Sequence, residues 1–138
     1  SLWEELAMAY FEAYHAGGSR EYLTRAAEGF RQVLDLGVTK SYLYTDLYTV
    51  YYQLGDYTAA GQALDDYQTM YPQDYMPHAL RGMLLITVEN QKEQSARDYR
   101  QAVSEYETAG QLIRSEDETA YYQQLGSLID QLRSNGWL

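Results

Sequence analysis

Apolar residues recur at helical spacing along the whole chain, and short polar or glycine-containing breaks interrupt them. The most regular stretch is residues 41–74, where Tyr44, Leu47 and Tyr51 follow a spacing of three and four residues. In an α-helix this spacing places the side chains on one face. The chain has only two prolines and no run of β-branched residues, and both facts favour helices over sheets. The pattern therefore predicts a set of amphipathic helices that each bury one apolar stripe.

The breaks divide the predicted helices into consecutive pairs. Residues 1–40 form the first pair, with a glycine-containing break before Ser19, which is the candidate N-cap of the second helix. Residues 41–74 form the next pair, in which Gly55 makes the turn and Asp56 caps the second helix.

The third predicted pair covers residues 75–114. Its second helix is expected to contain Ala96 and Tyr99 and to continue through Ile113, because one apolar stripe runs through these positions. A longer helix than usual is therefore expected here.

A last, unpaired helix is expected over residues 116–134. Ser115 and Glu118 have the spacing of a capping box at its start. Its outer face is mostly polar, as the end of a stacked helical array requires. Three pairs and this helix make seven predicted helices.

The 34-residue unit at 41–74 resembles a tetratricopeptide repeat. The signature residues of such repeats have counterparts at Tyr44, Leu47, Tyr51, Ala60, Leu64 and Pro72. The same first-helix positions are filled in the first pair by Trp3, Leu6, Ala7 and Tyr10. The resemblance implies an all-α fold, a right-handed α-α superhelix of about three tetratricopeptide-like helix hairpins plus a C-terminal capping helix. It also implies a single repeat domain over residues 1–138.

The chain departs from the repeat pattern at three positions. Tyr48 stands where a small residue is expected, and its bulk should push two helices apart or turn the ring aside. His78 and Arg81 replace an aromatic residue and a leucine in the third pair.

A second, narrower similarity concerns residues 95–99 and 135–138. These segments look like the C-terminal helical-repeat tails of bacterial serine/threonine protein kinase-like proteins. The glycine-rich loop and catalytic motifs of a kinase are absent from the chain. The similarity implies an accessory or sensory region, cut from a longer protein, rather than the phosphotransferase.

Charge and composition narrow the range of partners. The formal net charge is −10, and such an acidic surface repels nucleic acids and anionic membranes. The mean hydropathy is −0.54, and no apolar run is long enough to span a bilayer. The 16 tyrosines suit half-buried helix-packing positions or, alternatively, an exposed aromatic binding face. The composition leaves the cellular compartment open.

No arrangement of residues in the sequence predicts catalysis, a metal site or a cofactor. Cysteine is absent, so disulfides and thiolate ligands are excluded. His15 and His78 lie in different repeats, and neither has a helical partner four residues on. We expect a non-catalytic protein, with His78 as a hydrogen-bonded structural residue.

The one concentrated basic stretch contains Lys92, Arg97 and Arg100. Glu93 and Asp98 are interleaved with them, so ion pairs on a solvated helix face are expected.

The remaining candidate site is the concave groove that the first helices of successive repeats would line. A rotation of 100° per residue identifies the side chains that face away from the partner helix. They are Met8, Tyr42, Thr45, Asp46, Thr49, Tyr52, Met76, Leu80 and Met83. Methionine-rich surfaces adapt to varied partners, so we expect a protein or peptide partner, with Asp46 setting its register by pairing with a basic residue.

Tetratricopeptide proteins that bind a C-terminal carboxylate use lysine and asparagine on this face, and this chain offers neither at these positions. The alternative interpretation is a structural or self-association module. In that case the apolar strip packs either on the parent protein or on a second copy, the latter forming a homo-oligomer, and no free ligand exists.

Overall fold

The computed structural model describes residues 1–113 and 116–134, with the backbone alone for residues 116–122 and 125. Seven α-helices and one short 3-10 helix make up the regular structure of these residues, and no strand occurs among them. The predicted all-α, seven-helix fold is confirmed. The proposed cap at Ser115 and the segment 135–138 lie outside the described residues.

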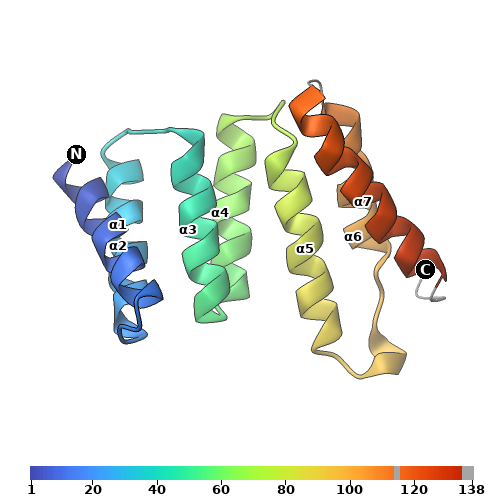
Figure 1. Cartoon of the computed structure of the whole chain (residues 1–138), viewed down its shortest axis with the longest axis horizontal. Helices are drawn as coiled ribbons and strands as arrows, with labels where there is room; N and C mark the ends of the chain where they lie inside the picture. Colours follow the sequence, from blue (N-terminus) through green and yellow to red (C-terminus); the bar gives the residue numbers. More distant parts are fainter. Residues whose placement is uncertain (114–115, 135–138) are drawn as a thin grey trace. The chain divides into compact units, whose positions relative to one another are not determined.

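Figure 1 shows the helices in colours that follow the sequence. Their bounds are α1 Leu2–His15, α2 Glu21–Asp35, α3 Ser41–Leu54, α4 Tyr57–Met70, α5 Met76–Asn90, the 3-10 helix Gln94–Ala96, α6 Arg100–Leu112 and α7 Glu116–Ser134. The chain forms two compact units, Ser1–Met70 with α1–α4 and Tyr71–Leu138 with α5–α7. The single domain expected over residues 1–138 stays a prediction.

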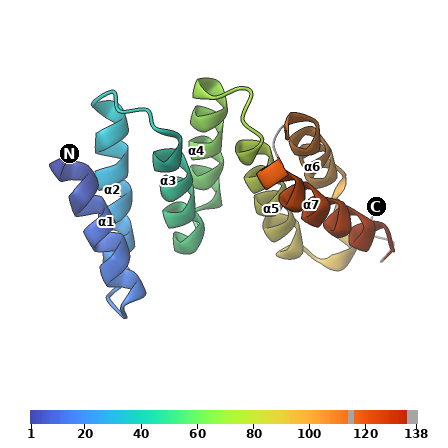
Figure 2. The same ribbon diagram turned by 45° about the horizontal axis from the view of Figure 1, so that its top comes forward.

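In the first unit α1 packs on α2, α3 packs on α4, and α2 also packs on α3. Neighbouring helices run in opposite directions, as both ribbon views show (Figures 1 and 2). Small residues allow the close approach of α1 and α2, because a Cβ atom added at Gly29 would lie 2.8 Å from the Cβ of Ala7. Phe30, Leu47 and Leu64 are completely buried in this core.

The turn between α3 and α4 follows the sequence prediction. Gly55 ends α3 with a positive φ of 75°, a conformation that glycine adopts without strain. The carboxylate of Asp56 accepts a hydrogen bond of 3.1 Å from the backbone N–H of Ala59, which confirms its role as an N-cap.

The N-terminus of α2 differs from the prediction. Ser19 is not the N-cap; that position belongs to Arg20, whose side chain makes no capping bond. The carbonyl of Ser19 instead accepts the N–H of Tyr22 in a tight first turn. The Arg20 guanidinium donates to the carbonyl of Leu54, at the negative end of α3.

Tyr48 does not separate the helices around it. Its ring is buried and lies 5.8 Å from the ring of Tyr52, one turn later on the same helix. On α4, Ala60 and Ala63 are completely buried, and α3 remains packed on α4.

In the second unit α5 packs on α6, and α6 packs on α7. Gly82 on α5 lies against the ring of Tyr106 on α6, because a Cβ atom added at Gly82 would meet that ring at 2.5 Å. Tyr106 is 1% exposed and forms a cluster with Ala79 and Ala109. The small residue required by the repeat pattern is thus used for close packing here.

The start of α6 is a correction to the sequence prediction. The helix begins at Arg100, so Ala96 lies in the 3-10 helix and Tyr99 only precedes α6. Ile113 follows α6 with an extended backbone. The predicted helix is therefore too long at both ends.

Local hydrogen bonds explain the late start of α6. The Asp98 side chain accepts the N–H of Arg100 at 3.0 Å, and the buried Glu89 carboxylate accepts the N–H of Asp98 at 2.9 Å. Arg97 donates to the carbonyls of Asn90 and Lys92. Side-chain bonds of this kind compete with helix formation.

Lys92 and Arg97 consequently lie in the connection between α5 and α6, and only Arg100, the first residue of α6, lies on a helix. Lys92 pairs with Glu89 at 2.6 Å, and Arg100 pairs with Asp98 at 2.7 Å. The expected pairs along one helix are thus wrong.

Candidate partner-binding surface

Six of the predicted site residues lie in the first unit, one on α1 and five on α3. Tyr42 is 42% exposed, and Met8 is half-buried. These two side chains line one open depression with a volume of about 540 Å³. Its full lining is Ser1, Glu4, Glu5, Met8, Ala9, Glu12, Lys40 and Tyr42. The structure thus brings together two candidates that are separated by 34 residues in the sequence.

Helical geometry explains how α1 contributes to the depression. Glu5, Met8 and Glu12 follow a spacing of three and four residues, so they share one face of α1. This face lies away from Ala7, which is buried against α2. Tyr42 stands in the first turn of α3 and reaches the same depression.

Two acidic side chains surround Tyr42. Its hydroxyl donates a hydrogen bond to Glu4, and this bond, with burial and the negative charges of Glu4 and Asp46, raises the pKa of Tyr42. Asp46 is half-buried, and burial, followed by repulsion from Glu4, raises the pKa of its carboxyl group. The side of α3 next to α1 is therefore an acidic environment.

The other candidates on α3 are half-buried. The hydroxyls of Thr45 and Thr49 bond to carbonyls of their own helix, Thr45 to Tyr42 at 3.1 Å and Thr49 to Thr45 at 2.8 Å. The ring of Tyr52 lies within 6 Å of two tyrosine rings, Tyr48 and Tyr57. The two threonines therefore have their hydroxyls bonded within α3, which leaves mainly their methyl groups for a contact.

The remaining three candidates lie on α5 in the second unit. Met83 is 45% exposed, and Met76 and Leu80 are half-buried. They occupy one face of the helix at a spacing of four and three residues. A single groove that joins α1, α3 and α5 stays a prediction.

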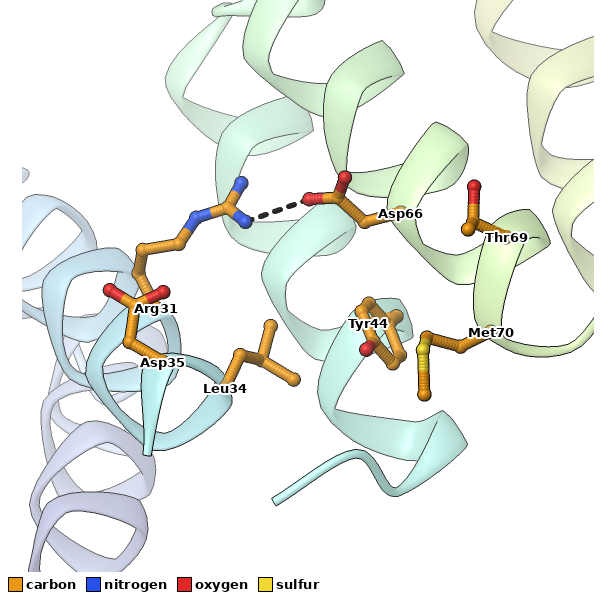
Figure 3. Close-up of a pocket in the computed structure, with 7 residues that line it drawn as sticks. All are labelled: Arg31, Leu34, Asp35, Tyr44, Asp66, Thr69 and Met70. Atoms are coloured by element: carbon orange, nitrogen blue, oxygen red, sulfur yellow. Dashed lines mark hydrogen bonds and ion pairs between the residues drawn. The ribbon is translucent and has the colours of Figure 1, made fainter. Parts of the chain in front are cut away.

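A second surface of the first unit was not predicted. An open depression of about 280 Å³ is lined by Leu34, Tyr44, Met70 and neighbouring polar residues, Arg31, Asp35, Asp66 and Thr69. Figure 3 shows Arg31 reaching from α2 to Asp66 on α4, at 2.9 Å. Burial alone lowers the pKa of Arg31, but its bonds to Asp66 and Tyr51 outweigh this effect and raise the pKa. The ion pair bridges the two helix pairs of this unit.

Sequence reasoning missed Glu4, Glu12 and Lys40 as lining residues of the first depression. Glu4 and Glu12 lie one turn before and one turn after Met8, so helical spacing alone predicts that both lie on the same face as Met8. Lys40 precedes α3 in an extended conformation, and no helical periodicity places it.

The described residues hold no cluster of three histidine or acidic side chains that could bind a metal ion. The Nδ1 atom of His78 lies 2.7 Å from the carboxylate of Glu105, and both side chains are largely buried. Within the same part of the chain, no helix has both the length and the apolar character needed to cross a bilayer.

Comparisons with known proteins identify the fold class. No protein-family model matches the chain, and no curated protein matches it in sequence. Two structures of SycD, the type III secretion translocator chaperone of Yersinia enterocolitica, match with TM-scores of 0.74 and 0.72 at 16% and 17% identity. They cover 99% and 94% of this chain and 95% and 88% of their own.

Two tetratricopeptide-repeat domains also match. The domain of Sgt2 from Aspergillus fumigatus has a TM-score of 0.62 at 12% identity, over 96% of this chain and 82% of its own. The first domain of Spaghetti (RPAP3), bound to the HSP90 peptide SRMEEVD, has a TM-score of 0.57 at 12% identity. The match covers 92% of this chain and 95% of that domain. The chain therefore has the helical-repeat fold of tetratricopeptide-repeat proteins.

Proposed function

We propose that this chain is a non-catalytic protein-interaction module that docks a peptide or a helix of a partner protein. The observation that carries the proposal is the open depression in which the exposed Tyr42 ring lies with Met8. An accessible aromatic ring beside an adaptable thioether is typical of protein-binding surfaces. Thr45, Thr49 and Tyr52 extend this surface along α3, and Met76, Leu80 and Met83 add a second contact on α5.

The structural matches support this class of function. SycD is a chaperone of a secretion translocator, and the Spaghetti domain carries a bound peptide. The narrower similarity to bacterial kinase-like tails has no support from these matches and stays a prediction.

The chemistry of the ligand should differ from that of the Spaghetti complex. The peptide in that complex, SRMEEVD, is acidic at its end. Glu4, Glu5 and Glu12 line the depression here, and like charges repel. We therefore expect SRMEEVD not to bind this chain.

The function can be tested with peptides selected for binding to the whole chain from a random library of about 16-residue peptides. Fluorescence anisotropy then measures the affinity of the best binder. Truncation of a central aromatic residue typically costs at least 1.4 kcal/mol, so Tyr42→Ala should weaken binding about tenfold or more. Tyr22→Ala, at a similarly exposed tyrosine on α2, is the matched control and should leave the affinity within about twofold.

Two results would contradict the proposal. One is the selection of no binder at all, and the other is an equal loss of affinity in the Tyr42 and Tyr22 variants. Met83→Glu, with Met70→Glu as a control of similar exposure, tests the contact on α5 in the same assay.

A specific observation favours the alternative of self-association. Large apolar side chains on α1 and the first turn of α2 are exposed, namely Leu2 (83%), Trp3, Leu6 and Tyr22. Exposed apolar patches are common at contacts between copies of a chain. A mass that rises with concentration in sedimentation, and returns to that of the monomer in Leu6→Glu or Met83→Glu, would favour this alternative.

A further inference from the structure

The depression between α1 and the start of α3 has a strong charge asymmetry. Glu4, Glu5 and Glu12 line it, against the single lysine Lys40. Asp46 lies one turn beyond Tyr42 on α3 and interacts electrostatically with Glu4. Because a hollow with an excess of one sign of charge concentrates the electric field, this depression attracts cations more strongly than an average part of the surface does.

The Glu4 carboxylate, which is bonded to Tyr42, retains acceptor capacity. A carboxylate offers about four acceptor positions, and the Tyr42 hydroxyl uses one of those on Glu4. Asp46 is partly desolvated and repelled by Glu4, which raises the pKa of its carboxyl group. A cation placed between Glu4 and Asp46 would remove this repulsion and gain charge-assisted hydrogen bonds.

An apolar surface accompanies the charges. Met8 is half-buried in the same depression, and the Tyr42 ring is exposed beside it. An aliphatic lysine or arginine stem can cover such surface while its charged end reaches the carboxylates. The site therefore suits a long cationic side chain better than a small ion.

We propose that this depression selects a partner segment that carries lysine or arginine next to an apolar side chain. The cation lies between Glu4 and Asp46, and the apolar side chain contacts Met8. This inference rests on the proposed function and names the chemistry of the partner for the same surface.

Lys40 defines the edge of the site. Its ammonium lies 5.9 Å from the centre of the Tyr42 ring, a distance at which a cation is attracted to the ring face. The carboxylates outnumber this lysine, so the depression keeps a negative excess that a partner can neutralise.

The test uses three helical peptides of about 16 residues, built from alanine and leucine with lysine, glutamine or glutamate at the same four positions. Their affinities for the whole chain are measured by fluorescence anisotropy at about 20 mM and about 300 mM NaCl. We expect the lysine peptide to bind about tenfold or more tightly than the glutamine peptide at low salt, and the glutamate peptide not to bind. The preference should shrink at high salt, because screening weakens exposed charge pairs.

Two double variants separate the site from the general charge of the chain. Glu4→Gln with Asp46→Asn removes the proposed cation contacts, and we expect about a tenfold or greater loss for the lysine peptide. Glu28→Gln with Asp35→Asn removes the same charge from exposed positions on α2 and should cost less than about threefold. Circular dichroism checks that both variants remain folded.

Three outcomes would overturn the inference. The lysine peptide could fail to bind, both double variants could lose affinity equally, or the glutamine peptide could bind as tightly as the lysine peptide. Each leaves the proposed function standing as long as a peptide from the random library depends on Tyr42. Failure of that library experiment would instead overturn the function itself.

Discussion

Single small residues decide how closely the helices of a pair approach. Gly82 packs against the buried ring of Tyr106, and Gly29 packs against Ala7. In both cases an added methyl group would meet an atom closer than normal van der Waals contact allows. The small residues of the repeat signature at Ala7 and Gly82 are therefore a packing requirement.

Gly82→Ala should destabilise the protein. The new Cβ would lie 2.5–2.9 Å from the ring of Tyr106, which is too buried to move aside freely. Overpacking of this kind costs about 1–3 kcal/mol, more than the gain in helix propensity. Urea unfolding measures the difference. Gly126→Ala on α7, where nothing lies within 4 Å of the new Cβ, is the control and should stabilise by about 0.5–1 kcal/mol. An equal gain in both variants would disprove the packing argument.

Asp46→Asn should stabilise the free protein in a pH-dependent way. Burial and Glu4 raise the pKa of Asp46 in the folded state above its usual value of 3.8, so the ionised form opposes folding. The gain in the free energy of unfolding should be present above the raised pKa and vanish as the pH falls below 3.8. Urea unfolding across this range checks the sign, with Asp35→Asn as the control. A gain that grows toward low pH would contradict the environment assigned to Asp46.

At the scale of elements, α5 and α6 are joined by a connection with its own hydrogen-bond network. Glu89, near the end of α5, accepts a hydrogen bond from the N–H of Asp98. The pKa of Glu89 is lowered first by its bond to Lys92 and then by this bond to the Asp98 N–H. The hydroxyl of Tyr99 donates to the side chain of Asn90. The end of α5 and the start of α6 therefore stabilise each other.

Asp98→Ala should fray the first turn of α6, because the N–H of Arg100 loses its side-chain acceptor. Hydrogen exchange of amides 100–103 should become faster. Asp98→Asn, which keeps an acceptor, is the control and should retain most of the protection. The bonds to Arg100 lower the pKa of Asp98 to about 2, so in the natural chain this protection should persist well below pH 3.8 and weaken only near pH 2. Unchanged exchange in Asp98→Ala would show that the Asp98 side chain does not protect the start of α6.

At the scale of the whole molecule, the charge of −10 affects both stability and association. Excess charge of one sign destabilises a compact state by self-repulsion, and salt screens this effect. The midpoint temperature of unfolding should therefore rise between about 20 mM and about 300 mM NaCl. Glu28→Lys with Asp35→Lys makes the chain less acidic and should reduce the rise. A midpoint that falls with salt would show that attractive ion pairs, such as Arg31–Asp66, outweigh the repulsion.

Periodicity in the sequence was sufficient to predict the helices and their order. Tyr44, Leu47 and Leu64 lie in the core as their spacing required, and Asp56 caps α4. These features depend on residues close together in the chain, so local propensity and amphipathic pattern determine them. The late start of α6 was not predicted, because it depends on the hydrogen bond between Glu89 and the N–H of Asp98, nine residues apart. The connection between these residues has no periodicity that would indicate this bond.

The acidic binding surface depended on tertiary structure. Helical rotation suggested that Met8, Tyr42 and Asp46 face away from their partner helices, but it did not place Glu4 beside Tyr42 across 38 residues. The ion pair of Arg31 with Asp66 is equally remote, at 35 residues. The sequence by itself determined which helices form and where they turn. Only the packing of α1 and α2 with α3 decided which charges meet, because electrostatic interaction depends on distance in space rather than along the chain.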